Sequence, residues 1–236
     1  MANFRDRPTS QVDNFVSGPP SRAGRYSEAY SLPMTAKEWV VADEGSYFVA
    51  ITPTPGTGII GHATPTTFDE TKPYLLVYNG GNNRIYPQFL RMHETVASIG
   101  GTGLQMTIAV DQGNRFSSGG TALTKSNVNM DSVNTTAATI TVGAVVASAA
   151  SSSRRVLGHY VLRPLTLIDI IEDEYQLTWG APDAFLNAVP AATVSNIQCT
   201  LPPMVIGPGQ SLLVHEWRAS QSTGPTWEVV FGYIER

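Results

Sequence analysis

Glycine and proline interrupt this chain so often that they limit its fold more than any other sequence feature. The 236 residues include 21 glycines and 16 prolines, so a residue that breaks regular structure occurs about every six or seven positions. Long amphipathic helices need uninterrupted runs of good helix formers, and this spacing excludes a helical bundle. Short strands joined by turns tolerate such spacing, and the sequence therefore predicts an all-β protein.

The closing segment, residues 226–235, carries the clearest strand pattern. Trp227, Val229, Phe231 and Tyr233 occupy alternate positions, which places them on one face of a strand and predicts that they belong to the core. About ten to twelve such short runs follow one another along the chain, with turn residues between them and no secure helix. The spacing indicates an antiparallel β-sandwich of jelly-roll type.

The domain organisation follows from where these runs begin. Residues 1–33 contain four prolines and show no regular period, and they are expected to form an extended, irregular amino-terminal arm. The β-sandwich is expected to occupy residues 34–236, beginning with a strand at 39–41. Residues 113–136 are polar and contain glycine, and they are expected to form a long surface loop.

The arm has a composition that suits attachment to another protein. Disordered tails seldom keep four aromatic residues in 33 positions, and the arm has a net charge of +1, which is too small to supply much affinity for nucleic acid. Its apolar side chains are expected to insert into a partner, and its arginines to pair with carboxylates there. The predicted partner-binding residues are Phe4, Arg5, Arg7, Phe15, Arg22, Arg25, Tyr26 and Tyr30.

The overall charge excludes several classes of partner. The formal net charge is −4, so electrostatics favour binding neither to nucleic acid nor to an anionic membrane. The amino terminus lacks the apolar stretch of a secretory signal peptide, and no apolar run has the length of a membrane span. These features predict a soluble protein made in the cytoplasm. Arginine accounts for 12 of the 15 basic residues, and this bias is typical of protein interfaces.

No motif in the chain predicts catalysis. The densest acidic group is Asp169 and Glu172–Glu174, whose spacing does not match a calcium loop. It is interpreted as a solvated strand end or an interface patch that meets arginines, with a metal site as the less favoured alternative. The four histidines are far apart in the sequence and are expected to be structural. We therefore expect no enzymatic activity, no cofactor and no bound metal.

Cysteine and tryptophan are assigned to the interior. Cys199 lies in an alternating apolar run, which predicts a buried strand residue. Trp179, Trp217 and Trp227 lie within strand patterns, which favours core or subunit-interface packing, although stacking on a carbohydrate stays open as an alternative.

Two stretches carry a resemblance to a known group of proteins. The segment Gly113–Thr124, with the Asn-rich run after it, and the turn Gly207–Leu212 with the closing strand Thr226–Glu235 resemble tailed-phage jelly-roll virion structural proteins of the capsid decoration, or cement, type. The resemblance covers about residues 75–235. It implies a trimeric protein on the outer surface of a phage head, and it transfers no site residues because its motifs perform no chemistry.

The sequence therefore predicts a virion structural protein that binds the major capsid protein and stabilises the shell, most simply as a homotrimer. Two alternatives stay open. One is a carbohydrate- or receptor-binding module of a phage tail or fibre, and the other is a jelly-roll major capsid protein.

Overall fold

The computed structural model describes residues 22–23, 29–30, 37–168, 171–180 and 196–236. The chain divides into two compact units, Met1–Val40 and Val41–Arg236. The first unit contains a two-stranded antiparallel ladder formed by β1 (Arg22–Ala23) and β2 (Ala29–Tyr30). These four residues are the part of the predicted arm, residues 1–33, that the structure describes.

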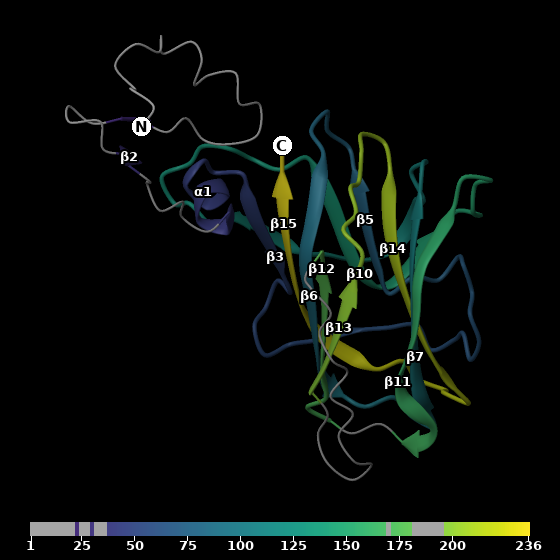
Figure 1. Cartoon of the computed structure of the whole chain (residues 1–236). Coiled ribbons are helices and arrows are strands. Elements are labelled where there is room, and N and C mark those ends of the chain that lie inside the picture. Colours follow the sequence, from purple (N-terminus) through teal and green to yellow (C-terminus); the bar gives the residue numbers. More distant parts are fainter. Residues whose placement is uncertain (1–21, 24–28, 31–36, 169–170, 181–195) are drawn as a thin grey trace, which may run out of the picture. The chain divides into compact units, whose positions relative to one another are not determined.

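The second unit is an all-β sandwich of two sheets that pack face to face (Figure 1). One sheet has the strand order β11-β7-β14-β5-β10-β8, and the other has the order β13-β12-β6-β15-β3-β9, with β4 paired to β15. Neighbouring strands are antiparallel except for the parallel pair β12 and β13. The strands are β3 (Tyr47–Ile51), β4 (Ile59–Ile60), β5 (Leu75–Asn79), β6 (Ile85–Val96), β7 (Thr102–Asp111), β8 (Phe116–Ala122), β9 (Thr124–Asn127), β10 (Ala138–Ala147), β11 (Arg155–Ile168), β12 (Glu174–Trp179), β13 (Asn196–Leu201), β14 (Ser211–Ala219) and β15 (Thr226–Glu235).

Eight of these strands form a regular pattern when they are counted in chain order as β3, β5, β6, β7, β11, β12, β14 and β15. Counted from one to eight, they lie in the order 1-8-3-6 in one sheet and 2-7-4-5 in the other. Strands β8 to β10 are inserted between the fourth and fifth of the eight, and β13 between the sixth and seventh. All neighbouring pairs among the eight are antiparallel.

The core lies between the two sheets, and the predicted face of β15 points into it. Trp227, Val229, Phe231 and Tyr233 are all buried, which confirms the sequence prediction for this strand. The sheet that contains β5 is also covered on its outer face, where Leu76 packs with Leu213 and Val145. Burial on both faces explains why β5 reads as a continuous apolar run rather than an alternating one.

A helix replaces the strand expected at 39–41. Helix α1 (Lys37–Asp43) ends in a Schellman motif, in which the Gly45 amide donates to the Ala42 carbonyl at 2.9 Å and the Ser46 amide donates to the Val41 carbonyl at 3.0 Å. Gly45 has a φ of +69°, which suits glycine at this position. The cap and the good helix formers in this segment outweigh the β propensity of its two valines. Residues 43–45 therefore form the end of the helix.

The stretch 113–136, expected as a long loop, contains strands β8 and β9. Strand β8 pairs with β10 in one sheet and β9 pairs with β3 in the other, so this stretch connects the edges of the two sheets. Its side chains are mostly exposed, which accounts for the polar composition. Within the described residues, no helix has the length and hydropathy of a membrane span.

Candidate functional site

The arm residues predicted to bind a partner lie almost entirely outside the described part of the chain. Of the eight, Arg22 and Tyr30 are described, and they are paired in the register of β1 and β2. The other six lie outside it, namely Phe4, Arg5, Arg7, Phe15, Arg25 and Tyr26. Binding of a partner by the arm therefore stays a prediction.

The acidic group 172–174 pairs with arginines. The buried Asp173 carboxylate accepts hydrogen bonds from Arg163 and from the Tyr175 hydroxyl. Glu174 accepts one from Arg91 at 2.7 Å, while Asp169 lies outside the described residues. Among the residues that the structure describes, no three His, Cys, Asp or Glu side chains gather where they could hold a metal ion.

The tryptophan and cysteine side chains singled out from the sequence are interior residues. Trp179, Trp217 and Trp227 are 6%, 5% and 0% exposed, so their rings are not available for stacking on a carbohydrate at the surface. Cys199 is buried in β13, as predicted, and burial raises the pKa of its thiol to about 11.

A surface that the sequence analysis did not single out lies at the end of the sandwich near the carboxyl terminus. Part of it is the loop Asn127–Asn134, between β9 and β10. Three asparagine side chains of this loop donate hydrogen bonds to backbone carbonyls at the end of α1: Asn127 to Gly45 at 2.9 Å, Asn129 to Asp43 at 2.9 Å and Asn134 to Gly45 at 3.1 Å. These bonds fix the loop to the start of β3.

The same loop also hydrogen-bonds to itself. The side-chain oxygen of Asn127 accepts the Asn129 amide at 2.9 Å, and that of Asn129 accepts the Asp131 amide at 3.0 Å. The Asn127 and Asn129 side chains are half-buried, while Met130 and Val133 are 98% and 94% exposed. A loop held by this many hydrogen bonds presents two apolar side chains to solvent in a fixed arrangement.

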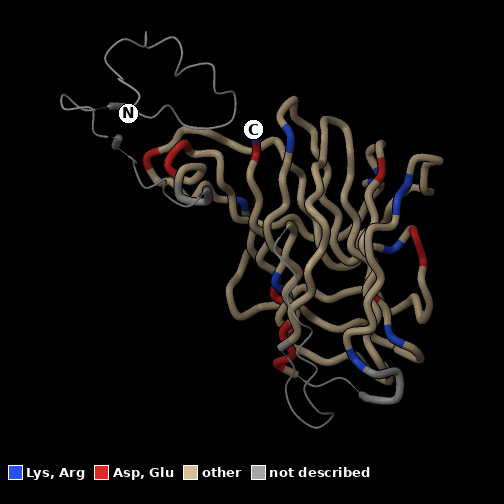
Figure 2. The backbone as a smooth tube through the Cα atoms, in the orientation of Figure 1, with Lys and Arg blue, Asp and Glu red and all other residues tan. Residues whose placement is uncertain are grey.

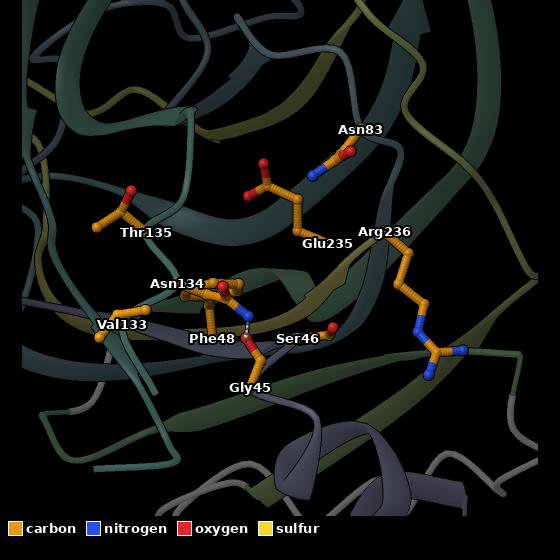
Figure 3. A pocket seen from close by; sticks show the side chains of 9 residues that line it. All are labelled: Gly45, Ser46, Phe48, Asn83, Val133, Asn134, Thr135, Glu235 and Arg236. Carbon is orange, nitrogen blue, oxygen red and sulfur yellow. Dashed lines mark hydrogen bonds between the residues drawn. The ribbon is translucent and has the colours of Figure 1, made fainter. Parts of the chain in front are cut away.

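A polar pocket of about 420 Å³ lies beside this loop (Figure 3). It is formed where four segments meet: the start of β3, the turn between β5 and β6, the end of the Asn127–Asn134 loop, and the last residues of β15. Its lining residues are Gly45, Ser46, Phe48, Asn83, Val133, Asn134, Thr135, Glu235 and Arg236.

Glu235 is the chemically distinctive residue of the pocket. It is 6% exposed, and its Oε1 atom accepts the Ala137 amide at 3.3 Å. Its Oε2 atom is buried and has no hydrogen-bond partner among the described residues. The neighbouring cation, Arg236, is paired with Glu44 instead. The pocket therefore contains a buried carboxylate oxygen whose hydrogen-bonding capacity is unused.

The base of the pocket contains packed aromatic rings, and acidic residues lie near it at the end of α1. Phe48 stacks on Tyr233 with ring centroids 5.7 Å apart, and the Tyr233 hydroxyl bonds to the Thr136 hydroxyl at 2.9 Å. Acidic residues gather near the end of α1 (Figure 2), where Asp43 and Glu44 precede β3. A ligand with hydrogen-bond donors and positive charge fits this environment best.

Sequence reasoning missed Glu235, although a signal was present. The alternation Trp227, Val229, Phe231, Tyr233 continues to Glu235, so the rule that places the aromatic residues in the core also places this carboxylate on the inward face of β15. A charged residue at the end of a core-facing series marks the rim of the sandwich, where a polar site can form.

Comparison of the chain with protein-family models, with curated proteins and with solved structures finds no match.

Proposed function

We propose that this protein is a virion structural protein of the capsid decoration type, which binds the major capsid protein of a phage head and stabilises the shell. The observation that carries this proposal is the fixed Asn127–Asn134 loop, which exposes Met130 and Val133 beside the polar pocket. Apolar side chains that a hydrogen-bonded loop holds in solvent are a preformed contact for another protein.

The topology supports the same proposal. Two antiparallel sheets with strand orders 1-8-3-6 and 2-7-4-5 are the arrangement of a jelly roll, a fold used by viral capsid proteins among others. Two of the segments that carry the resemblance to phage decoration proteins lie at the end of the chain, where Gly207–Gln210 precedes β14 and Thr226–Glu235 is β15. Fold alone does not define function, so the topology supports the loop argument without replacing it.

The energetics of attachment are adequate for such a role. Burial of an exposed Met or Val side chain contributes about 1.5–3 kcal/mol, or about 3–6 kcal/mol for the pair. A trimer would present three copies of the loop and three arms to a capsid of matching symmetry. Multivalent attachment of this kind raises avidity by orders of magnitude over a single contact.

The test is co-sedimentation with heads assembled from a major capsid protein that the same genome encodes. Met130→Ser combined with Val133→Ser should reduce the bound fraction at least tenfold without changing the melting temperature. The matched control is Val156→Ser with Val205→Ser, which removes two valines of 51% and 47% exposure elsewhere on the sandwich. Full binding by the loop variant would overturn the proposal. So would the absence of a capsid gene near this gene together with the absence of binding to heads.

The arm and the oligomeric state are tested in the same system. Deletion of residues 2–30 should leave the sandwich folded, with a nearly unchanged melting temperature, while weakening incorporation into heads. Light scattering of the full chain should give three times the monomer mass. Unfolding of the deletion variant would make the arm part of the core, and a monomer both in solution and on the particle would exclude the trimer.

The alternatives from the sequence have less support. A carbohydrate-binding tail or fibre module needs exposed aromatic platforms, whereas the three tryptophans proposed for that role are buried. A major capsid protein stays compatible with the topology. Assembly of the purified chain alone into shells would favour it over a decoration protein.

A further inference from the structure

We propose that the Glu235 pocket binds the guanidinium group of an arginine side chain supplied by the partner protein. This inference deepens the proposed function, on which it rests for the existence of a protein partner, by naming the contact group that the partner provides. It depends on the unused carboxylate oxygen, the pocket volume and the acceptors around it.

The first step is the cost of burying a carboxylate without a full set of partners. Glu235 is 6% exposed, yet its Oε2 atom has no hydrogen-bond partner in the described part of the chain. Buried carboxylates are normally paired with a cation or saturated with hydrogen bonds. Arg236, the cation among the lining residues, bonds to Glu44. The site is therefore suited to a donor that arrives from outside the chain.

The second step concerns the shape of the donor. Asn83, Thr135 and Glu235 come from three separate segments and line the same pocket (Figure 3). Each offers an oxygen acceptor, namely an amide carbonyl, a hydroxyl and a carboxylate. A guanidinium carries five N–H donors in one plane and satisfies several acceptors at once, whereas an ammonium is a compact point charge.

The third step is fit. A pocket of about 420 Å³ is within the range of sites that enclose small organic groups, and it is large enough for an arginine side chain. Phe48 and Val133 also line it, and they provide apolar surface against which the arginine methylenes can lie. A calcium ion is a poorer occupant, because it requires six to eight oxygen ligands and the pocket supplies one carboxylate at its buried end.

The test uses the full-length protein labelled for TROSY NMR and titrated with N-acetyl-arginine amide. We expect saturable shift changes at pocket residues such as Ser46 and Thr135, with affinity in the millimolar range. N-acetyl-lysine amide should bind several-fold more weakly, and N-acetyl-citrulline amide, which keeps the shape of arginine but lacks the charge, should not saturate. The assay contains no capsid, so its outcome is independent of the co-sedimentation test.

Substitutions locate the binding group. Glu235→Gln keeps the acceptor for Ala137 and should weaken arginine binding at least about tenfold, because it removes a charge-assisted pair. Asp131→Asn, which removes an exposed charge in the adjacent loop, should change it less than twofold. If Glu235→Gln fails to fold, Asn83→Ala on the exposed rim serves instead and should weaken binding on the order of fivefold.

Three results would overturn the inference. These are the absence of saturable binding, equal binding of the citrulline or lysine compound, and unchanged arginine binding in Glu235→Gln. The absence of binding would mean that the pocket takes no arginine side chain, and equal binding of the citrulline or lysine compound would mean that it does not select the charged guanidinium group. The third result would place the arginine site elsewhere.

Discussion

Truncation of Phe231 to alanine tests the core directly. The Phe231 ring is fully buried in β15, stacked on Tyr233 with centroids 5.5 Å apart and edge-on to Trp179 at 6.1 Å. Loss of the transfer free energy of a phenylalanine side chain costs about 1.5–3 kcal/mol. A residual cavity on the order of 100 Å³ adds about 2 kcal/mol. The free energy of unfolding should therefore fall by about 3.5–5 kcal/mol.

Urea unfolding followed by tryptophan fluorescence measures this change, and the melting temperature should fall by roughly 7–20 °C. Val230→Ala is the control, because Val230 is a half-buried neighbour on the opposite face of the same strand. It should cost much less than Phe231→Ala. Equal stability of Phe231→Ala and the parent protein, or a larger loss in the control, would mean that β15 presents its other face to the core.

Three further outcomes follow from buried groups. Arg218 is fully buried, bonded to Glu216 at 2.9 Å and Glu94 at 3.1 Å and placed over Trp227. Arg218→Met should therefore reduce the free energy of unfolding, measured by urea denaturation, by about 3–5 kcal/mol. A neutral effect would mean that the two carboxylates find other partners. Burial alone would raise the pKa of Asp111, but hydrogen bonds from Ser151 and Arg115 outweigh it and hold that pKa well below its usual range. Below about pH 4 the unfolded chain takes up a proton at this site before the native chain does, so stability falls with falling pH. Between pH 7 and 2.5 the melting temperature of Asp111→Asn should fall less steeply than that of the parent protein. An equal fall in the two proteins would contradict this. The buried Cys199 thiol, with a pKa raised to about 11, should resist DTNB at pH 8 until the protein is unfolded, and rapid reaction of the native protein would contradict its burial.

The parts of the fold that could be predicted from sequence are those in which one face of a strand is buried. Alternation in β15 identified its core residues correctly, because a period of two maps directly onto inward and outward positions. The same reasoning fails where backbone pairing alone forms the strand. Strand β8 pairs with β10 although its side chains are mostly exposed and it contains Gly119 and Gly120, and glycine is depleted in strands.

The error at α1 and the omission of Glu235 have different causes. The valines of α1 favour a strand, and the competing signal for a helix end is local, namely the Gly45 that closes the Schellman cap. Glu235, in contrast, could have been found by continuing the alternation of β15 by one step. The partner groups around it come from turns that are distant in sequence, so the pocket itself was not predictable.

The Asn127–Asn134 loop reverses the usual relation between composition and exposure. Its sequence is rich in asparagine, which indicates a solvated polar loop, yet the asparagine amides bond to the loop and to the end of α1 while Met130 and Val133 face solvent. A flexible loop with the same two apolar residues would lose conformational entropy on binding a partner. Here that cost is met during folding by side-chain hydrogen bonds, so most of the free energy of burying Met130 and Val133 is available for attachment. Polar residues that fix a loop can thus contribute to an apolar contact that they do not themselves make.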